Sequence, residues 1–146
     1  MLTKILVPID GSETAYRALA YAMELGKAYG SEIIVGHVSV PYDFTKLPPR
    51  KPKNAIEEAD MAKEAKNPTP IEIAQAQTAQ AGYTKVTFRE AVALDPAARI
   101  IGQAKLLGVD LIVMGNRGMG VLAGFLMGSV STKVAQSAEC PVVIVK

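Results

Sequence analysis

The residues that most clearly suggest chemistry form a glycine-rich array in the last third of the chain. Gly115 and Gly118 are separated by two residues, and nine further residues lead to Gly128 and Ser129. Glycine lets a backbone approach a ligand closely because it has no Cβ. Gly128 and Ser129 open a helical pattern over residues 130–138. The first N–H groups of a helix, at its positive dipole end, attract anions. The array therefore predicts a phosphate-binding cradle.

Two better-known glycine signatures fit this segment less well. A P-loop needs lysine and then serine or threonine after its last glycine, whereas Gly128 is followed directly by Ser129. Gly118, Gly120 and Ala123 do match the dinucleotide pattern G-x-G-x-x-A. That pattern belongs after the first strand, with an acidic residue about 20 positions further on. Because this copy follows a late apolar run, we interpret it as coincidental. A surface loop that binds nothing is the alternative to the phosphate cradle.

The composition is that of a globular protein. The chain has 146 residues, of which 49% are hydrophobic, and a formal net charge of +2. This balance does not favour a nucleic acid or a membrane as partner. Cys140 is the only cysteine, which excludes an internal disulfide and fits a reducing compartment. No signal peptide or long apolar run is visible. We expect one cytoplasmic domain over residues 1–146.

Short apolar runs alternate with helical patterns along the chain. Strands are predicted at 5–9, 33–38, 85–92, 111–114 and 142–145, and helices at about 15–25, 97–107 and 130–138. Asp95 and Pro96 mark the start of the helix at 97–107, with Asp95 as its cap and proline at its first position. A proline-rich insertion at about 41–70 contains a charged helix at about 55–66, and a second helical piece follows at 71–81. This alternation predicts an α/β fold, Rossmann-like or flavodoxin-like, with an open five-stranded parallel sheet and helices on both faces.

The expected strand order places the polar residues together. In such sheets the ligand crevice lies outside the carboxyl ends of the strands, where the strand order reverses. If the first and fourth strands flank that reversal, the order is 3-2-1-4-5. Asp10, which follows the first strand, then faces Gly115, which follows the fourth. The strand at 85–92 would lie at one edge of the sheet.

Four segments together resemble the universal stress protein family. They are residues 7–12 (VPIDGS), Asp95-Pro96, residues 110–115 (DLIVMG) and residues 140–145 (CPVVIV). The resemblance covers nearly the whole chain except about 42–83. In that family the glycine array marks the members that bind ATP. The resemblance therefore implies ATP or another adenine nucleotide as ligand, with Mg²⁺.

The resemblance also implies roles for particular residues. Gly115, Gly118, Gly128 and Ser129 match the positions that hold phosphates. Asp10 matches the acid beside the nucleoside and any metal. Val38 matches a residue that contacts adenine through its backbone. The full set that we expect to bind the nucleotide is Pro8, Asp10, Val38, Met114, Gly115, Arg117, Gly118, Gly128, Ser129, Val130 and Ser131.

Several of these residues have a simpler alternative role. Asp10 and Ser129 are residue types that cap helices, which is compatible with a place beside a ligand. Arg117 could pair with phosphate or be a solvated loop arginine. His37, near a strand end, is best interpreted as structural, and Cys140 as a small buried hydrophobic residue.

The sequence contains no recognisable catalytic constellation, so we assign no catalytic residue. We predict an ATP-binding stress-response protein that acts as a nucleotide-dependent sensor or switch. A slow ATP hydrolase, or a nucleotidyl or phosphoryl transferase, is one alternative, and an interaction protein with a vestigial nucleotide site is another. The family typically pairs its last strand with a second copy, so a homodimer through Val142–Val145 is expected. The signal, the downstream partner and the choice among ATP, ADP, AMP and cyclic nucleotides stay open.

Overall fold

The computed structural model describes residues 1–41, 51–64, 67–117 and 127–146. In these ranges every predicted strand and helix is present. The elements in chain order are β1 (Lys4–Ile9), α1 (Glu13–Tyr29), β2 (Glu32–Ser39), α2 (Ala55–Glu64), α3 (Pro70–Gln80), β3 (Val86–Val92), α4 (Pro96–Leu107), β4 (Leu111–Gly115), α5 (Ser129–Ser137) and β5 (Val142–Val145). None of the described helices combines the length and the apolar character needed to cross a membrane.

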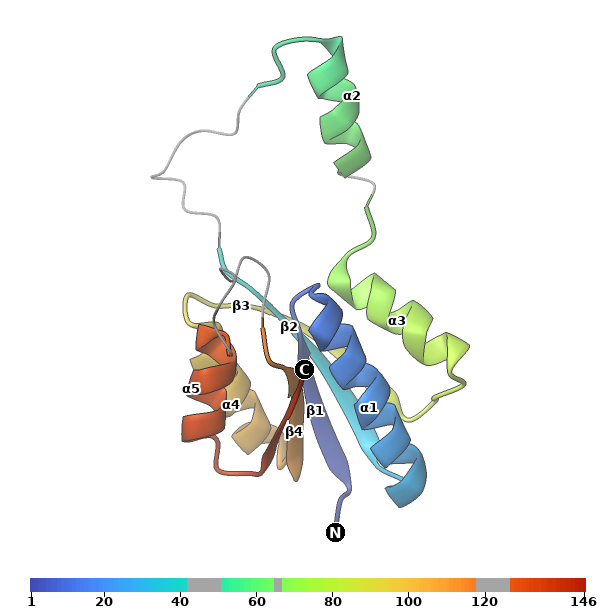
Figure 1. Cartoon of the computed structure of the whole chain (residues 1–146), viewed down its shortest axis with the longest axis vertical. Coiled ribbons are helices and arrows are strands. Elements are labelled where there is room, and N and C mark those ends of the chain that lie inside the picture. Colours follow the sequence, from blue (N-terminus) through green and yellow to red (C-terminus); the bar gives the residue numbers. More distant parts are fainter. Residues whose placement is uncertain (42–50, 65–66, 118–126) are drawn as a thin grey trace.

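The five strands form one parallel sheet in the order β3-β2-β1-β4-β5. This confirms the predicted fold and strand order. Helices α1 and α3 cover one face of the sheet, and α4 and α5 cover the other (Figure 1). The chain first moves outward from β1 to β2 and β3 and then returns to the other side of β1. The order therefore reverses between β1 and β4, and β3 and β5 are the edge strands.

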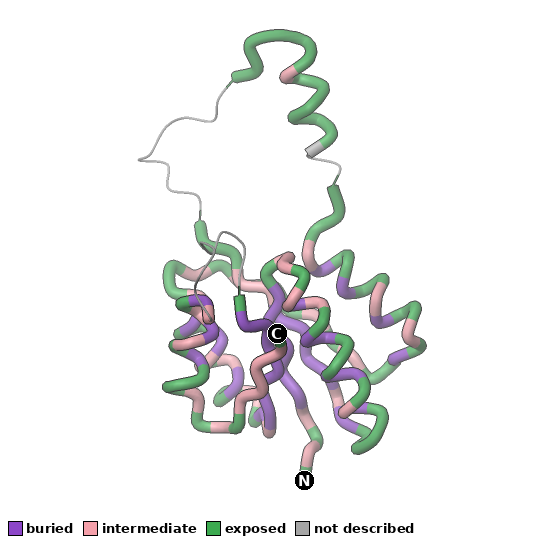
Figure 2. Tube along the Cα trace, viewed as in Figure 1, coloured by how far each residue is buried: buried purple, intermediate pink, exposed green. Residues whose placement is uncertain are grey.

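Alternating side chains of the central strands fill two separate cores. Figure 2 shows that the central strands are mostly buried. Ile5 and Val7 of β1 pack beneath α1 and α3, whereas Leu6 between them packs beneath α4 and α5. Side chains of successive strand residues point to opposite faces, and both faces of a parallel sheet are covered. Continuous apolar runs in β1 and β4 are the sequence signature of this arrangement. They hold the carboxyl ends of both strands at fixed positions.

The two helices of the insertion differ in their packing. Thr69 and Glu72 form a capping box at the start of α3, with Pro70 at its first position. Gln77 of α3 donates from Nε2 to the carbonyl oxygen of Tyr16 in α1, at 2.9 Å. Helix α2, in contrast, stands away from the sheet (Figure 1), and from Ala55 to Lys63 every side chain except that of Glu57 is exposed. The predicted helix at 55–66 is thus present to Glu64, and residues 65–66 lie outside the described ranges.

Two long-range contacts fix the sheet at the end opposite the carboxyl termini of its strands. The hydroxyl of Tyr83 donates to the carbonyl oxygen of Ser31 at 2.6 Å, in a buried position. The Asp110 carboxylate accepts from the Thr3 hydroxyl at 2.6 Å and from the backbone N–H groups of Thr3 and Lys4, at 2.8 and 2.9 Å. These hydrogen bonds, the one from the Thr3 hydroxyl foremost, lower the pKa of Asp110 to about 2.

Candidate functional site

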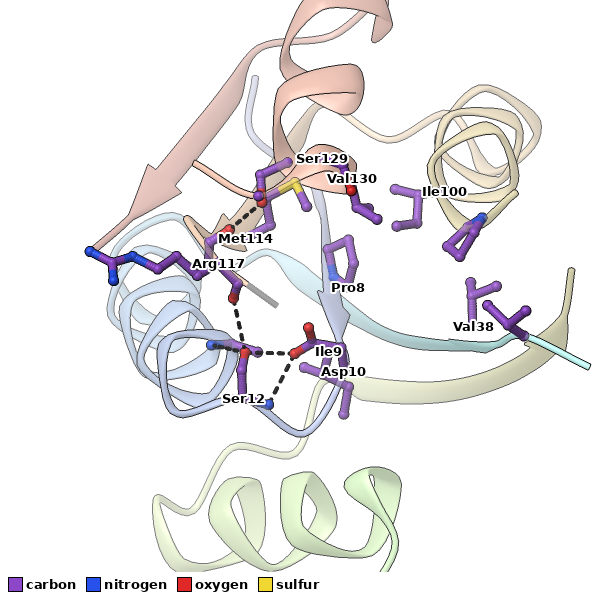
Figure 3. Close-up of a pocket in the computed structure, with 16 residues that line it drawn as sticks. Pro8, Ile9, Asp10, Ser12, Val38, Ile100, Met114, Arg117, Ser129 and Val130 are labelled. Atoms are coloured by element: carbon purple, nitrogen blue, oxygen red, sulfur yellow. Dashed lines mark hydrogen bonds between the residues drawn. The ribbon is translucent and has the colours of Figure 1, made fainter. Parts of the chain in front are cut away.

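A cavity of about 300 Å³ lies at the carboxyl ends of β1 and β4 (Figure 3). Its size is at the lower end of the range for small-molecule sites. We call this cavity the crevice. Every described residue of the predicted site lines it, namely Pro8, Asp10, Val38, Met114, Gly115, Arg117, Gly128, Ser129, Val130 and Ser131. Gly118 lies outside the described residues.

The apolar end of the crevice contains residues that were not among the predicted site residues. Val40 follows β2, and Pro96 and Ile100 come from the first turns of α4; all three line the crevice with Val38. The Asp95-Pro96 helix start was predicted, and Asp95 does cap α4 by accepting from Ala98 N–H at 3.1 Å. Combined with the strand order, that helix start was the signal that could have placed α4 here.

The turn after β1 is organised by Ser12. Gly11 has a φ of 90°, a conformation that favours glycine. Ser12 is the N-cap of α1, and its hydroxyl accepts from Ala15 N–H at 3.3 Å. Asp10 accepts from the Ser12 N–H at 3.0 Å and from the Ser12 hydroxyl at 2.6 Å. The interpretation of Asp10 as the helix cap is therefore wrong: Asp10 holds the cap residue, and its carboxylate lines the crevice.

Gly115 ends β4 directly against the first turn of α1. A Cβ at Gly115 would lie 2.5 Å from Thr14 Oγ1, 2.8 Å from the Thr14 carbonyl carbon and 2.9 Å from Ala15 N. The start of α1 also holds Arg117. The hydroxyls of Ser12 and Thr14 lie 3.2 and 2.9 Å from the Arg117 carbonyl oxygen. Packing against α1 alone therefore requires glycine at 115, a reason that the sequence did not show.

The amino end of α5 opens into the crevice from the other side. Gly128 is its N-cap, with φ −73° and ψ 162°, and no side chain caps this helix. Ser129 is instead its exposed first residue, so the interpretation of Ser129 as the cap is wrong. Gly128 N–H donates to the Asn116 carbonyl at 2.7 Å, and the buried Ser131 hydroxyl donates to the Gly115 carbonyl at 2.8 Å. The start of α5 is thus bound to the end of β4.

The charges around the crevice favour an anion at one end. The amino ends of α1 and α5 both lie at its rim, and each carries a partial positive charge. Burial raises the pKa of the nearby Tyr16 hydroxyl, and the negative charge of Asp10 adds to this. Lys133 of α5 pairs with Asp95 of α4 and, by donating to it, lowers the pKa of that carboxyl. This pair joins the two helices beside the crevice.

The remaining candidate residues have positions that serve the fold. His37 Nδ1 lies 2.9 Å from the carbonyl oxygen of Ile9, consistent with the structural role predicted for this histidine. Cys140 is half-buried against the core beneath α4 and α5, and burial raises the pKa of its thiol. Figure 3 shows the Arg117 side chain pointing away from Pro8 and Val38. No group of three or more His, Cys, Asp or Glu side chains in the described ranges is placed to hold a metal ion.

Comparisons with known proteins agree with this architecture. The model of the universal stress protein family matches residues 1–146. Universal stress protein YxiE of Bacillus subtilis is 34% identical over 150 residues, and all of both chains is covered. A universal stress protein of Thermus aquaticus is 34% identical over 149 residues, again with full coverage of both.

Two solved structures extend the similarity to three dimensions. One is a universal stress protein in complex with cAMP, 28% identical, with a TM-score of 0.69 over 99% of this chain and 97% of that one. The other is the protein MJ0577, 29% identical, with a TM-score of 0.74 over 100% and 96%. The family model and the full-length relatives lead to one conclusion: the chain belongs to the universal stress protein family.

Proposed function

We propose that this chain binds an adenine nucleotide, ATP with Mg²⁺, and acts as a cytoplasmic regulatory protein whose state follows nucleotide occupancy. The observation that carries the proposal is the convergence of the α1 and α5 amino ends on one crevice whose opposite end is apolar. A nucleotide has the same polarity, with charged phosphates at one end and a flat, largely apolar base at the other. The whole chain would serve as one nucleotide-binding domain, with the insertion at about 41–70 as an addition to it.

The phosphate end would be formed by Gly128, Ser129 and the free amides of the first turn of α5. Extended backbone at Gly128, with no side chain, leaves room for close approach of an oxyanion. Asp10 is the carboxylate beside it, accompanied by the hydroxyls of Ser12 and Ser129. Mg²⁺ is commonly bound through one or two carboxylates together with substrate phosphates. This donor set therefore fits a metal ion that arrives with the nucleotide rather than one held by protein alone.

The base end would be the apolar part of the crevice. Val38 and Val40 come from the end of β2, and Pro96 and Ile100 come from α4. The similar universal stress protein solved with cAMP supports an adenine ligand. Because these four described side chains offer no hydrogen-bonding groups, discrimination among bases would rest on shape and on the backbone.

A regulatory role fits the crevice better than catalysis. Of the described residues that line it, Asp10 is the one carboxylate, and none is histidine, cysteine or lysine. General acid–base or nucleophilic chemistry needs a partner for such a carboxylate. We therefore expect bound ATP to be recovered unchanged, and ADP and AMP release measured by chromatography tests this. Multiple turnovers that disappear in Asp10→Ala would move the protein to the hydrolase or transferase class.

Calorimetric titration with ATP, ADP, AMP and cAMP is the direct test of binding. Gly128→Val should abolish binding, because its side chain would occupy the space of the phosphate. Valine tolerates the extended backbone found at Gly128. A loss of ATP affinity would therefore come from the filled phosphate space and not from backbone strain. Gln136→Val, at an exposed position of the same helix, is the matched control and should bind normally. Equal ATP affinity in both variants would refute the proposed phosphate site.

We further propose a homodimer through β5, which is an edge strand paired only with β4 within the described sheet. The alternation of a parallel ladder settles which amides are available. Ile112 N–H donates to the Pro141 carbonyl, and Asn116 N–H donates to the Val145 carbonyl. With this register, Val143 N–H points toward β4 and Ile144 N–H points outward.

The variant that tests the dimer is consequently Ile144→Pro, which removes an outward donor. Val143→Pro would break the internal ladder and destabilise the sheet itself. Light scattering after size exclusion should show a dimeric wild type and a folded, monomeric Ile144→Pro. A wild type that stays monomeric throughout the micromolar range would exclude the dimer.

A further inference from the structure

A second cavity, of about 330 Å³, lies on the other side of the residues that follow β4. We call it the basic cavity. It is lined by Glu13, Thr14, Arg17, Asn116, Arg117 and Lys146. These residues come from the first turns of α1, from the two positions after β4 and from the position after β5. The basic cavity shares Arg117 with the crevice, but no other lining residue.

The charges in the basic cavity are unbalanced. Among the lining side chains, Arg17, Arg117 and Lys146 are cationic and only Glu13 is anionic, which leaves an excess of two positive side-chain charges. Glu13 is already paired with Arg17 at 2.5 Å. Within the described part of the chain, neither the Arg117 guanidinium nor the Lys146 ammonium has a hydrogen bond or an ion pair. Like charges repel one another unless an anion is placed between them.

The backbone on which these cations stand is held in place. The Arg117 carbonyl accepts from the Thr14 hydroxyl at 2.9 Å, which fixes the chain after β4 to α1. Arg17 Nη1 donates to the backbone oxygen of Lys146 at 3.4 Å, which fixes the end of β5 to the same helix. The Arg117 side chain points away from Pro8 and Val38, that is, away from the interior of the crevice (Figure 3). Three elements therefore present their cations to one small space.

We propose that the basic cavity binds a phosphate group. A phosphate carries close to two negative charges at neutral pH and accepts several hydrogen bonds, which suits the excess of cationic side chains around the cavity. Guanidinium groups bind it in a forked geometry, and an ammonium adds a point charge. The phosphate group has two sources: free inorganic phosphate, or the distal phosphates of a nucleotide that extends past Arg117 from the crevice. The second source alone rests on the proposed nucleotide function.

Phosphorus NMR and calorimetry with inorganic phosphate test the first source, on protein with and without saturating AMP. Lys146→Gln and Arg17→Gln, whose side chains line the basic cavity alone, should each weaken phosphate binding about two- to fivefold and leave AMP affinity unchanged. Lys27→Gln is the matched control, since Lys27 also lies on α1 beside an acidic partner, Glu24, but outside this cavity. It should change neither affinity. Raising the salt concentration should weaken phosphate binding in the wild type.

The second source is tested with ATP and AMP on the same variants. If ATP binds more tightly than AMP and Lys146→Gln removes that advantage, the phosphate in the basic cavity belongs to the nucleotide. If free phosphate does not bind and Lys146→Gln leaves the ATP and AMP affinities unchanged, the inference is overturned. AMP binding separates this failure from that of the proposed function. If AMP binds and Lys146→Gln has no effect, the assignment of the crevice stands and the basic cavity is refuted. If phosphate binds and AMP does not, the basic cavity stands and the proposed function is refuted.

Discussion

Gly115→Ala is the most informative single substitution in the chain. The added methyl group would lie 2.5 Å from Thr14 Oγ1 and within 2.9 Å of two backbone atoms of α1. Backbone atoms cannot rotate away as a side chain can, so β4 or α1 must shift. Overpacking of this kind costs about 1–3 kcal/mol. Because each kcal/mol lowers the Tm of a domain of this size by about 2–4 °C, we expect a Tm lower by roughly 2–12 °C.

Gly102→Ala provides a control with the opposite expected sign. Gly102 lies in the middle of α4, and a Cβ there would meet nothing within 4 Å. Alanine is favoured over glycine in a helix by about 0.5–1 kcal/mol, so Tm should rise by roughly 1–4 °C. The two substitutions make the same chemical change, and only the surroundings of the glycine differ.

Thermal unfolding followed by circular dichroism, without any ligand, measures both effects. A third variant separates the side-chain contact from the backbone contacts. Adding Thr14→Ala to Gly115→Ala removes the nearest atom but not the Thr14 and Ala15 backbone, so stability should recover only in part. Wild-type stability in Gly115→Ala, or full recovery on adding Thr14→Ala, would show that the close packing of β4 on α1 is not what requires this glycine.

Three further substitutions concern contacts of Asp110 and Tyr83, far from the crevice, and of Tyr16 within α1. The pKa of Asp110 is about 2 in the fold and near 4 in the unfolded chain. The contribution of its carboxylate to folding stability is therefore complete above about pH 4 and is lost as the pH falls toward 2. Asp110→Asn should lower Tm at pH 7, and the difference in Tm from the wild type should close near pH 2. Tyr83→Phe should cost about 1–2 kcal/mol, because it leaves the buried Ser31 carbonyl without its 2.6 Å bond. Tyr16→Phe should be neutral or stabilising, since the buried Tyr16 hydroxyl meets no hydrogen-bond partner in the described ranges. Urea unfolding measures the stability of both tyrosine variants. An equal loss of stability in Tyr16→Phe and Tyr83→Phe would contradict this reasoning.

Much of the fold could be predicted because its signals are local. The apolar run of β4 ends in Gly115, and Asp95-Pro96 marks the start of α4; neither needs knowledge of the rest of the chain. The strand order was predicted by placing its reversal between the first and fourth strands, where Asp10 and Gly115 then face each other. The observed sheet confirms this order. The crevice then gathers Asp10 and Ser129 from distant parts of the sequence, as that order required.

What the sequence could not supply depends on tertiary contacts. Asp10 and Ser12 are both capping residue types, and only the turn at Gly11 decides that Ser12 caps α1. The requirement for Gly115 comes from the backbone of α1, about a hundred positions earlier. A similar case is Gly26, where a Cβ would lie 2.7 Å from Cζ of Tyr83. No local pattern reports which element a glycine packs against.

The central place of β1 has a consequence for synthesis on the ribosome. Its neighbours in the sheet are β2 and β4, and the contact that closes β4 onto the start of β1 joins Asp110 and Thr3, 107 positions apart. A growing chain can therefore assemble only the β3-β2-β1 half of the sheet before β4 emerges. During that interval, about 1–4 s at 5–20 residues per second, one edge of an apolar strand lacks the partner that will cover it. An uncovered edge pairs readily with other chains, so the species of this protein most exposed to aggregation is its half-made sheet.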